Sequence, residues 1–289
     1  MTEAHQQLLS RIRTYCESRP DIRCLALIGS QSGKAEFADV YSDLDLLIVS
    51  TDCTPYFLEE GWLSAIDPVW LSFSEAVPEA NHQERRAVFS GALDVDFVLA
   101  DAALLEEKSD VLPILREICA AGVDVLIDKD NFGTHLRSFV HDPKPFTFPT
   151  EVQYRNVVQD FGFHVLWATK KLLRGEKWTA QRCITGYLMR HLLTLLEWEA
   201  HARHGVEWRT FYEGRHLTMW LDTDRQERLG DLAAPWDPAG LEQSLRNLCD
   251  YFSEVAVSFA SSQGFISPTE AFREIRAWMD AHPAIDLPQ

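Results

Sequence analysis

A chain of 289 residues, with 46% hydrophobic and 25% charged side chains, has the composition of a soluble globular protein and room for one large domain or two ordinary ones. Its net charge of −17 argues against a nucleic acid partner, because Lys and Arg contacts to phosphate supply most of that affinity. The same charge would attract a cationic ligand, although many proteins are acidic only for solubility.

The cysteines and the amino terminus indicate the cellular compartment in which the protein works. The six cysteines are scattered, and none forms a Cys-x-x-Cys pair or a zinc-like spacing with histidine. Such residues are typical of reduced, mostly buried thiols in a cytoplasmic protein. The first seven residues lack the basic and apolar regions of a signal peptide, and no apolar run approaches membrane-spanning length. We expect a cytoplasmic monomer with no membrane partner.

Helical and strand-like patterns alternate through the first half of the chain. An amphipathic helix is predicted over 3–18, and further helices over 56–66 and 102–120, the last interrupted near Pro113. Short apolar or alternating runs predict strands at 23–28, 44–49, 69–73, 85–89, 91–99 and 123–127. This mixture predicts an α+β domain.

Residues 141–150 hold three prolines and cannot form regular structure, so they mark a boundary. Beyond them, strand signals nearly vanish. Helices are predicted over 151–174, from a cap at Thr179 towards Ala202, over 238–261 and over 268–281. The sequence therefore predicts an α+β domain at 1–140, a Pro-rich connector at 141–149 and an all-helical domain at 150–289.

An Asp-x-Asp pair stands at the start of the apolar run 44–49. Because strand side chains alternate between faces, Asp43 and Asp45 point the same way and lie side by side at the edge of a sheet. Like charges this close raise one another's pKa unless a cation intervenes, and Mg²⁺ shares such oxygen ligands with substrate phosphates. The alternative is a pair of solvated acids at the start of a strand.

Two further features extend this pattern. Gly29 and Ser30 end the strand 23–28, where glycine lets the backbone approach a phosphate and N–H groups bind the anion. Asp94 and Asp96 lie on one face of the strand 91–99. Three carboxylates from two strands, near a Gly-Ser turn, predict a site for two metal ions and a triphosphate. Without the acids, a plain Gly-Ser turn would be the better interpretation.

Gly-Ser, a spacer of twelve residues, Asp-x-Asp and a later strand Asp together resemble the nucleotidyltransferase superfamily. The segments Val125–Asp130, Trp167–Arg174 and Leu195–Trp198 follow in the order of the aminoglycoside 6-adenylyltransferase (streptomycin adenylyltransferase) family, to which roughly residues 20–221 are similar. The resemblance implies a nucleotidyltransferase-type mixed sheet with flanking helices, followed by an all-helical substrate-binding domain.

The same resemblance implies an activity of the antibiotic-resistance type. AMP would pass from ATP to a hydroxyl of an aminoglycoside such as streptomycin, with release of pyrophosphate. Asp43, Asp45 and Asp96 would bind two Mg²⁺ ions, and Asp96 could also accept the proton of the attacking hydroxyl. Asp94 is the alternative to Asp96 as the third carboxylate of the site. If Asp96 has that role, Asp94 holds substrate or is a solvated acid.

Four residues of the second half match family positions. Lys170 and Arg174, one helical turn apart, would lie near the triphosphate, although a solvated basic face is an equal alternative. Glu197 would receive a substrate ammonium group and Trp198 would stack on the sugar. The alternative is a helix-surface acid beside a core tryptophan.

The chain also departs from the family pattern. Gln31 occupies a position where family members commonly have a basic residue. Residues 211–217 only partly match a Lys-rich segment of the family, in which Arg215 replaces one lysine. These departures leave open a different small-molecule or protein hydroxyl as acceptor. An inactive nucleotide-binding relative is disfavoured, because all three acids are present.

Overall fold

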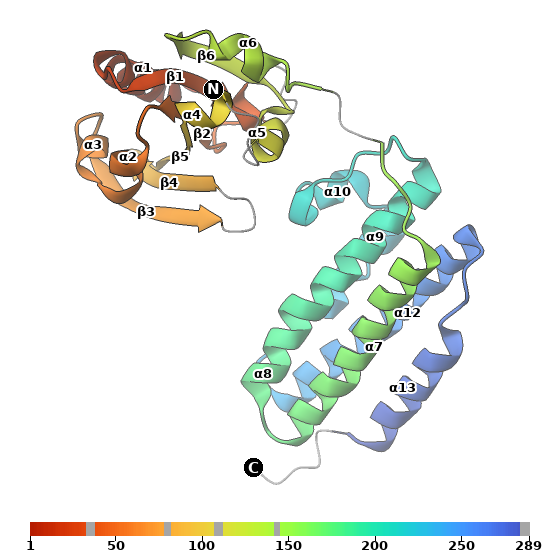
Figure 1. Ribbon diagram of the computed structural model, residues 1–289. Coiled ribbons are helices and arrows are strands. Elements are labelled where there is room, and N and C mark those ends of the chain that lie inside the picture. Colours follow the sequence, from red (N-terminus) through yellow and green to blue (C-terminus); the bar gives the residue numbers. More distant parts are fainter. Residues whose placement is uncertain (33–37, 78–81, 107–111, 142–144, 284–289) are drawn as a thin grey trace. The chain divides into compact units, whose positions relative to one another are not determined.

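A computed structural model describes residues 1–32, 38–77, 82–106, 112–141 and 145–283 (Figure 1). The chain divides into two compact units, unit 1 (Met1–Lys144) with two hydrophobic cores and unit 2 (Pro145–Gln289) with one. Parts of three predicted segments lie outside the described residues, namely 33–37 of the twelve-residue spacer, 107–111 of the helix predicted over 102–120 and 142–144 of the connector.

Unit 1 is built on a six-stranded mixed sheet with the strand order β3-β4-β5-β2-β1-β6. Only the β2–β5 pair is parallel among the five described pairings. The six predicted strands all form: β1 (Ile22–Ile28), β2 (Leu44–Ser50), β3 (Val69–Val77), β4 (His82–Phe89), β5 (Leu93–Asp101) and β6 (Val123–Asp128). β2 lies between β5 and β1, and its apolar run is buried on both faces.

Helices cover both faces of this sheet. One core joins the sheet to α1 (Glu3–Ser18), α2 (Thr54–Leu58) and α3 (Gly61–Ser64). The other joins it to α4 (Ala102–Glu106), α5 (Leu112–Cys119) and α6 (Phe132–Arg137). Leu47 and Val49 of β2 belong to this second core. Because side chains alternate along a strand, Asp45 points to the same face as these two residues.

Two details of unit 1 differ from the prediction. The single helix predicted over 56–66 is wrong: Glu59 adopts an extended backbone between α2 and α3, while the Trp62 indole N–H donates to the Tyr56 carbonyl at 3.1 Å. Helix α6 was not predicted. Its start depends on Asp128, whose carboxylate accepts the N–H groups of Phe132 and Gly133 at 3.0 Å each.

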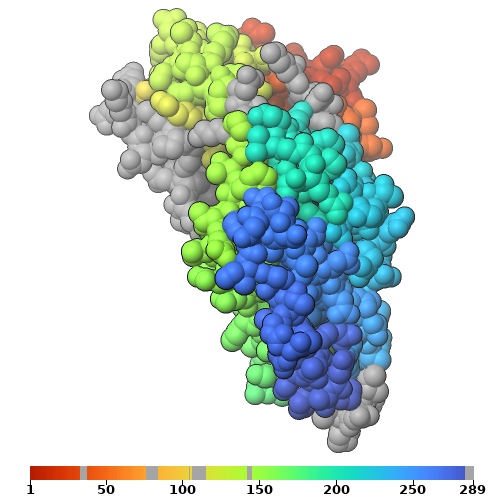
Figure 2. All heavy atoms as spheres, turned by 90° about the vertical axis from the view of Figure 1, so that its right-hand side faces the viewer, coloured from red at the N-terminus to blue at the C-terminus, as the bar shows by residue number. Residues whose placement is uncertain are grey.

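Every regular element in the described part of unit 2 is helical. Phe161 of α7 (Glu151–Leu173) stacks on Phe252 of α12 (Pro238–Gln263) with ring centroids 3.6 Å apart. Figure 2 shows α13 (Thr269–Ala281) beside α7, which it contacts. The long elements are α7 (Glu151–Leu173), α9 (Met189–His204), α12 (Pro238–Gln263) and α13 (Thr269–Ala281). The short elements are α8 (Lys177–Arg182), η4 (Tyr212–Gly214), α10 (Leu217–Trp220), α11 (Thr223–Gln226) and η5 (Leu229–Leu232).

Helix ends in unit 2 follow from local chemistry. Thr150 and Gln153 form a reciprocal capping box that starts α7. The predicted cap at Thr179 is wrong, because α8 starts at Lys177, directly after the turn at Gly175. A π-helical segment, η3 (Cys183–Leu188), joins α8 to α9. None of the helices in the described residues combines the length and hydrophobicity that a bilayer crossing requires.

Candidate active site

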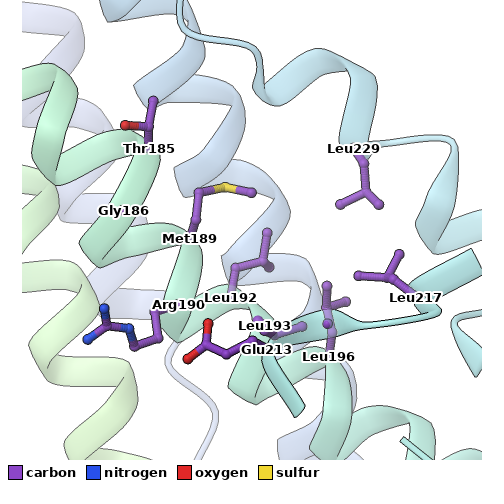
Figure 3. A pocket seen from close by; sticks show the side chains of 11 residues that line it. Thr185, Gly186, Met189, Arg190, Leu192, Leu193, Leu196, Glu213, Leu217 and Leu229 are labelled. Carbon is purple, nitrogen blue, oxygen red and sulfur yellow. The ribbon is translucent and has the colours of Figure 1, made fainter. Parts of the chain in front are cut away.

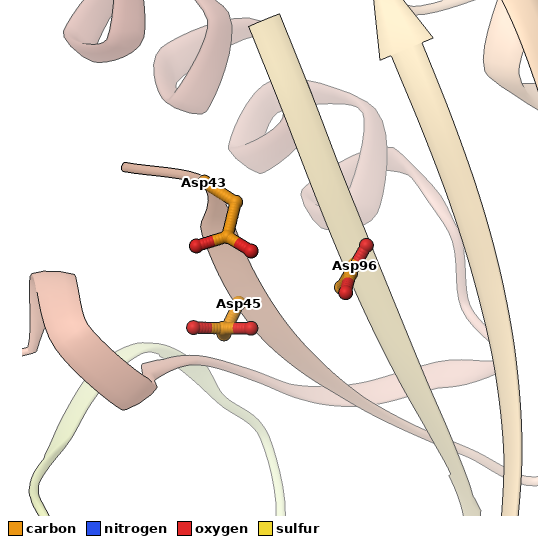
Figure 4. A group of neighbouring side chains, drawn as sticks. All are labelled: Asp43, Asp45 and Asp96. Atoms are coloured by element: carbon orange, nitrogen blue, oxygen red, sulfur yellow. The ribbon is translucent and has the colours of Figure 1, made fainter. Parts of the chain in front are cut away.

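Three carboxylates meet at the amino-terminal end of β2. Asp43 directly precedes this strand and Asp45 is its second residue, while the parallel register places Asp96 of β5 beside Asp45. One carboxylate oxygen from each residue lies within 4.8 Å of the other two (Figure 4). The predicted side-by-side pair is present, but on an internal strand and not at an edge of the sheet.

The Gly-Ser turn lies directly against this acidic triad. Gly29–Gln31 forms a short 3₁₀ turn (η1), and the Ser30 N–H donates to the Asp45 carboxylate. Gly29 has φ +65°, and a Cβ atom there would lie 2.1 Å from Asp45 Oδ2. Glycine is required here both for its backbone conformation and for the space that the carboxylate occupies.

Two polar side chains complete the turn in different ways. The Gln31 amide donates to the Ser42 carbonyl at 3.5 Å, so it ties the turn to the residue before Asp43. The Ser30 hydroxyl is buried and has no hydrogen-bond partner among the described residues. Leaving such a group unsatisfied costs about 1–3 kcal/mol. A polar ligand that reached this hydroxyl would remove that cost.

The pKa values of two carboxyl groups in the triad, Asp45 and Asp96, are strongly raised. Burial, together with the charges of Asp43 and Asp96, raises the pKa of Asp45 to about 7. Burial also raises the pKa of Asp96 to about 6, although the Arg86 guanidinium lowers it and Asp43 raises it further. A site that holds carboxylates against their own repulsion is suited to bind a cation.

Arg86 is a residue of this site that sequence reasoning missed. It lies on β4 directly opposite Asp96, and its guanidinium is 3.6 Å from that carboxylate. The same group is 2.9 Å from Glu84 and 3.1 Å from Glu75. Only the strand register brings Arg86 to Asp96, and the sequence pattern does not reveal register.

Asp94 stays outside the triad. It shares the face of β5 with Asp96 by alternation, but its side chain is exposed and pairs in register with Val88. Its charge contributes to the raised pKa of Asp96.

Lys170 and Arg174 lie at the carboxy-terminal end of α7, in unit 2. The Lys170 ammonium group is 5.8 Å from the centre of the Trp278 ring of α13. The Arg174 guanidinium is 4.0 Å from Glu176. Their predicted contact with the triphosphate stays a prediction.

Glu197 and Trp198 lie on α9, also in unit 2. Burial and the charge of Glu213 raise the pKa of Glu197 to about 7. Trp198 packs in the core, with its ring centre 5.7 Å from that of Phe259. Glu213 was missed from sequence because it approaches α9 from η4, where it adopts a left-handed backbone with φ 52°.

The mixed sheet, the Gly-Ser turn and the strand-held carboxylates define a nucleotidyltransferase. A family model described as streptomycin adenylyltransferase matches residues 2–282. The chain belongs to this family, which confirms the resemblance drawn from the motifs.

Two solved structures align with most of the chain. An aminoglycoside 6-adenyltransferase from Bacillus subtilis is 15% identical, with 96% of each chain covered and a TM-score of 0.44. A nucleotidyltransferase-like protein from Exiguobacterium sibiricum is 10% identical, with 96% of this chain and 88% of that chain covered and a TM-score of 0.31. No curated protein matches the chain.

Proposed function

We propose that this protein is a Mg²⁺-dependent enzyme that transfers AMP from ATP to a hydroxyl of an aminoglycoside such as streptomycin and releases pyrophosphate. The observation that carries the proposal is the triad of Asp43, Asp45 and Asp96, packed against a turn whose Ser30 hydroxyl has no partner in the described structure. Family membership supports ATP and an aminoglycoside as the substrates.

The donor set fits a hard divalent cation. Carboxylate oxygens are the ligands that Mg²⁺ prefers, and it shares them with substrate phosphates. Asp43, Asp45 and Asp96 would hold two Mg²⁺ ions. When bound, these ions neutralise charge on the triphosphate and on the departing pyrophosphate.

The turn and the cationic side chains would hold the phosphates. The Ser30 hydroxyl, which has no partner in the described structure, would donate to a phosphate oxygen, and Gly29 lets the turn lie close against the Asp45 carboxylate. Lys170 and Arg174 would add positive charge where the pyrophosphate leaves. The acceptor oxygen then bonds to the α-phosphorus as the bond to pyrophosphate breaks.

Asp96 would accept the proton of the acceptor hydroxyl. Asp96 suits this role by position, because it lies on β5 beside Asp45, with one carboxylate oxygen close to those of the other two acids. Asp94, exposed on the same strand face, would contact the acceptor.

Helix α9 would recognise the acceptor in the helical domain. In the described structure, neither Glu197 nor Glu213 forms an ion pair with a cationic side chain. The pKa of Glu197 is raised to about 7. An ammonium group between them would relieve their repulsion. The sugar would stack on the part of the Trp198 ring that Phe259 does not cover.

The test is pyrophosphate release from ATP and Mg²⁺, with and without streptomycin. We expect release that depends on streptomycin, falls about a thousandfold or more in Asp45→Asn, and is unchanged in the exposed control Asp52→Asn. Glu197→Gln should raise the KM for streptomycin about tenfold with little change in kcat, because it removes one charge-assisted contact.

Two results would contradict parts of this proposal. Tight Mg²⁺-ATP binding without release in the presence of any aminoglycoside would eliminate the acceptor but keep the nucleotide site. Full activity in Asp45→Asn would eliminate the metal site.

A further inference from the structure

A cavity of about 490 Å³ lies within unit 2 and shares no residue with the acidic triad. Its volume falls in the range of small-molecule sites. Four structural elements contribute to its wall: α7, α8, η3 and α9. The lining residues are His164, Trp167, Trp178, Thr179, Arg182, Cys183, Gly186, Tyr187 and Arg190.

A neighbouring cavity of about 360 Å³ provides a contrast (Figure 3). It shares Gly186 and Arg190 with the first cavity, but its other walls are mainly leucines and Met189. No aromatic ring lines it. The larger cavity, which we call the aromatic cavity, is therefore chemically distinct.

Aromatic rings form much of the wall of the aromatic cavity. Trp178 is 68% exposed, and its only described ring partner is Trp236, 6.1 Å away and itself 53% exposed. Large exposed aromatic side chains gathered at one place are typical of a binding surface. The π-helical turn contributes Gly186, where even an added Cβ would meet nothing within 4 Å, so the wall is open there.

Two arginines give the aromatic cavity its charge. In the described structure, the guanidinium groups of Arg182 and Arg190 make no hydrogen bond or ion pair. By contrast, Arg203, Arg225 and Arg246 of the same unit each bind carboxylates. Two unpaired guanidinium groups lining one cavity, in a chain of net charge −17, indicate an anionic ligand.

Part of the wall is held in place before any ligand arrives. The Tyr187 hydroxyl donates to Asp160 at 2.8 Å, and His191 Nε2 lies 3.0 Å from the same oxygen. His164 Nδ1 lies 2.7 Å from the other Asp160 oxygen, and its ring centre is 4.2 Å from that of Tyr187. Asp160 is thus occupied by its neighbours, and a ligand would find these two rings already ordered.

We propose that the aromatic cavity binds a planar aromatic anion, with its ring against Trp178 and Trp167 and its phosphate or carboxylate group on Arg182 and Arg190. Among the described residues, the cluster that could hold a metal ion is the triad of unit 1, which shares no residue with this cavity. We therefore expect binding here without Mg²⁺, in contrast to the nucleotide binding proposed at the triad.

The experiment is calorimetric titration of the full chain with AMP and, separately, with 4-hydroxybenzoate, both in EDTA. These two probes separate a nucleotide from an aromatic carboxylate. We expect at least one to bind, equally well to the wild type and to Asp45→Asn. Arg182→Gln with Arg190→Gln, and Trp178→Ala alone, should each weaken it about tenfold or more. Adenosine and inorganic phosphate should bind more weakly than AMP if AMP is the bound probe.

Arg155→Gln is the control for the substitution type, because it removes one arginine charge from an exposed position of α7 that does not line the cavity. Near-ultraviolet circular dichroism checks that each variant is folded. The proposal is overturned if neither probe binds, if binding requires Mg²⁺ or Asp45, or if Arg155→Gln weakens it as much as the cavity variants. Loss of streptomycin-dependent pyrophosphate release would not bear on it.

Discussion

At position 45, a carboxylate takes a place that apolar side chains occupy further along the same strand face. The buried environment and the neighbouring acids oppose its charge, whereas the hydrogen bond from the Ser30 N–H favours it. Such an arrangement costs stability unless a cation binds. The residues of the turn and the triad therefore have to be considered together.

Replacing Gly29 by alanine tests the contact between turn and triad. Because φ is +65° and the new Cβ would collide with Asp45, we expect Gly29→Ala to lower the free energy of unfolding by about 2 kcal/mol and to weaken Mg²⁺-ATP binding. The control is Gly61→Ala in α3, where the added methyl meets nothing within 4 Å. Chemical denaturation and nucleotide titration give the two readouts. Equal effects of both substitutions would refute the contact.

The raised pKa of Asp45 predicts a pH-dependent stability. Between about pH 4 and 7 the unfolded chain has released a proton that folded Asp45 still holds, so this residue destabilises the fold increasingly as pH rises through that window. Asp45→Asn removes the effect. In EDTA, its stability advantage over the wild type should be about 2 kcal/mol larger at pH 8 than at pH 5.

Thermal unfolding at both pH values measures this difference. Saturating Mg²⁺ should reduce it at pH 8, since the ion stabilises only the charged carboxylate. A difference that does not change with pH would show that Asp45 is ionised normally.

Among the elements of unit 2, one buried ion pair joins three helices. The Arg225 guanidinium of α11 donates to both Glu199 oxygens of α9, at 2.7 and 2.6 Å, and to Glu254 of α12 at 2.6 Å. Glu199 and Arg225 are both buried. The partners come from separate helices, so no sequence period indicates the pairing.

Breaking this pair should destabilise the helical unit. Glu199→Gln leaves a buried guanidinium without its main counter-charge, so we expect a loss of about 3 kcal/mol. The matched control is Glu270→Gln in α13, whose pair with Arg273 is exposed and should change stability by less than about 0.5 kcal/mol. Urea denaturation followed by circular dichroism distinguishes them. Similar midpoints for both variants would count against a structural role for the pair.

For the molecule as a whole, the net charge of −17 should affect how a polycation binds. Salt screens long-range attraction, with a Debye length of about 10 Å at 0.1 M. Raising NaCl from about 50 to 500 mM should therefore raise the KM for streptomycin several-fold, while the KM for Mg²⁺-ATP, itself an anion, should not rise. Steady-state pyrophosphate release gives both values. Parallel changes would indicate a general salt effect on the enzyme.

The architecture was predictable to different degrees in the two units. The strands of unit 1 were found because their apolar runs are short and end at turn residues, and β2 and β5 were found together with their acids. Helix α6 was missed because its start depends on the Asp128 side chain, not on a hydrophobic period. The cap predicted at Thr179 was wrong because α8 begins at Lys177, so that Thr179 lies inside this helix.

The sequence by itself determined the family, the succession of strands and helices, and the acids that form the triad, because these depend on local spacing and on the alternation of strand side chains. Tertiary structure alone decided which groups meet from distant segments. It placed Arg86 opposite Asp96, left the Ser30 hydroxyl unsatisfied and brought Glu213 to Glu197. Register and packing set these contacts, and neither leaves a period in the chain.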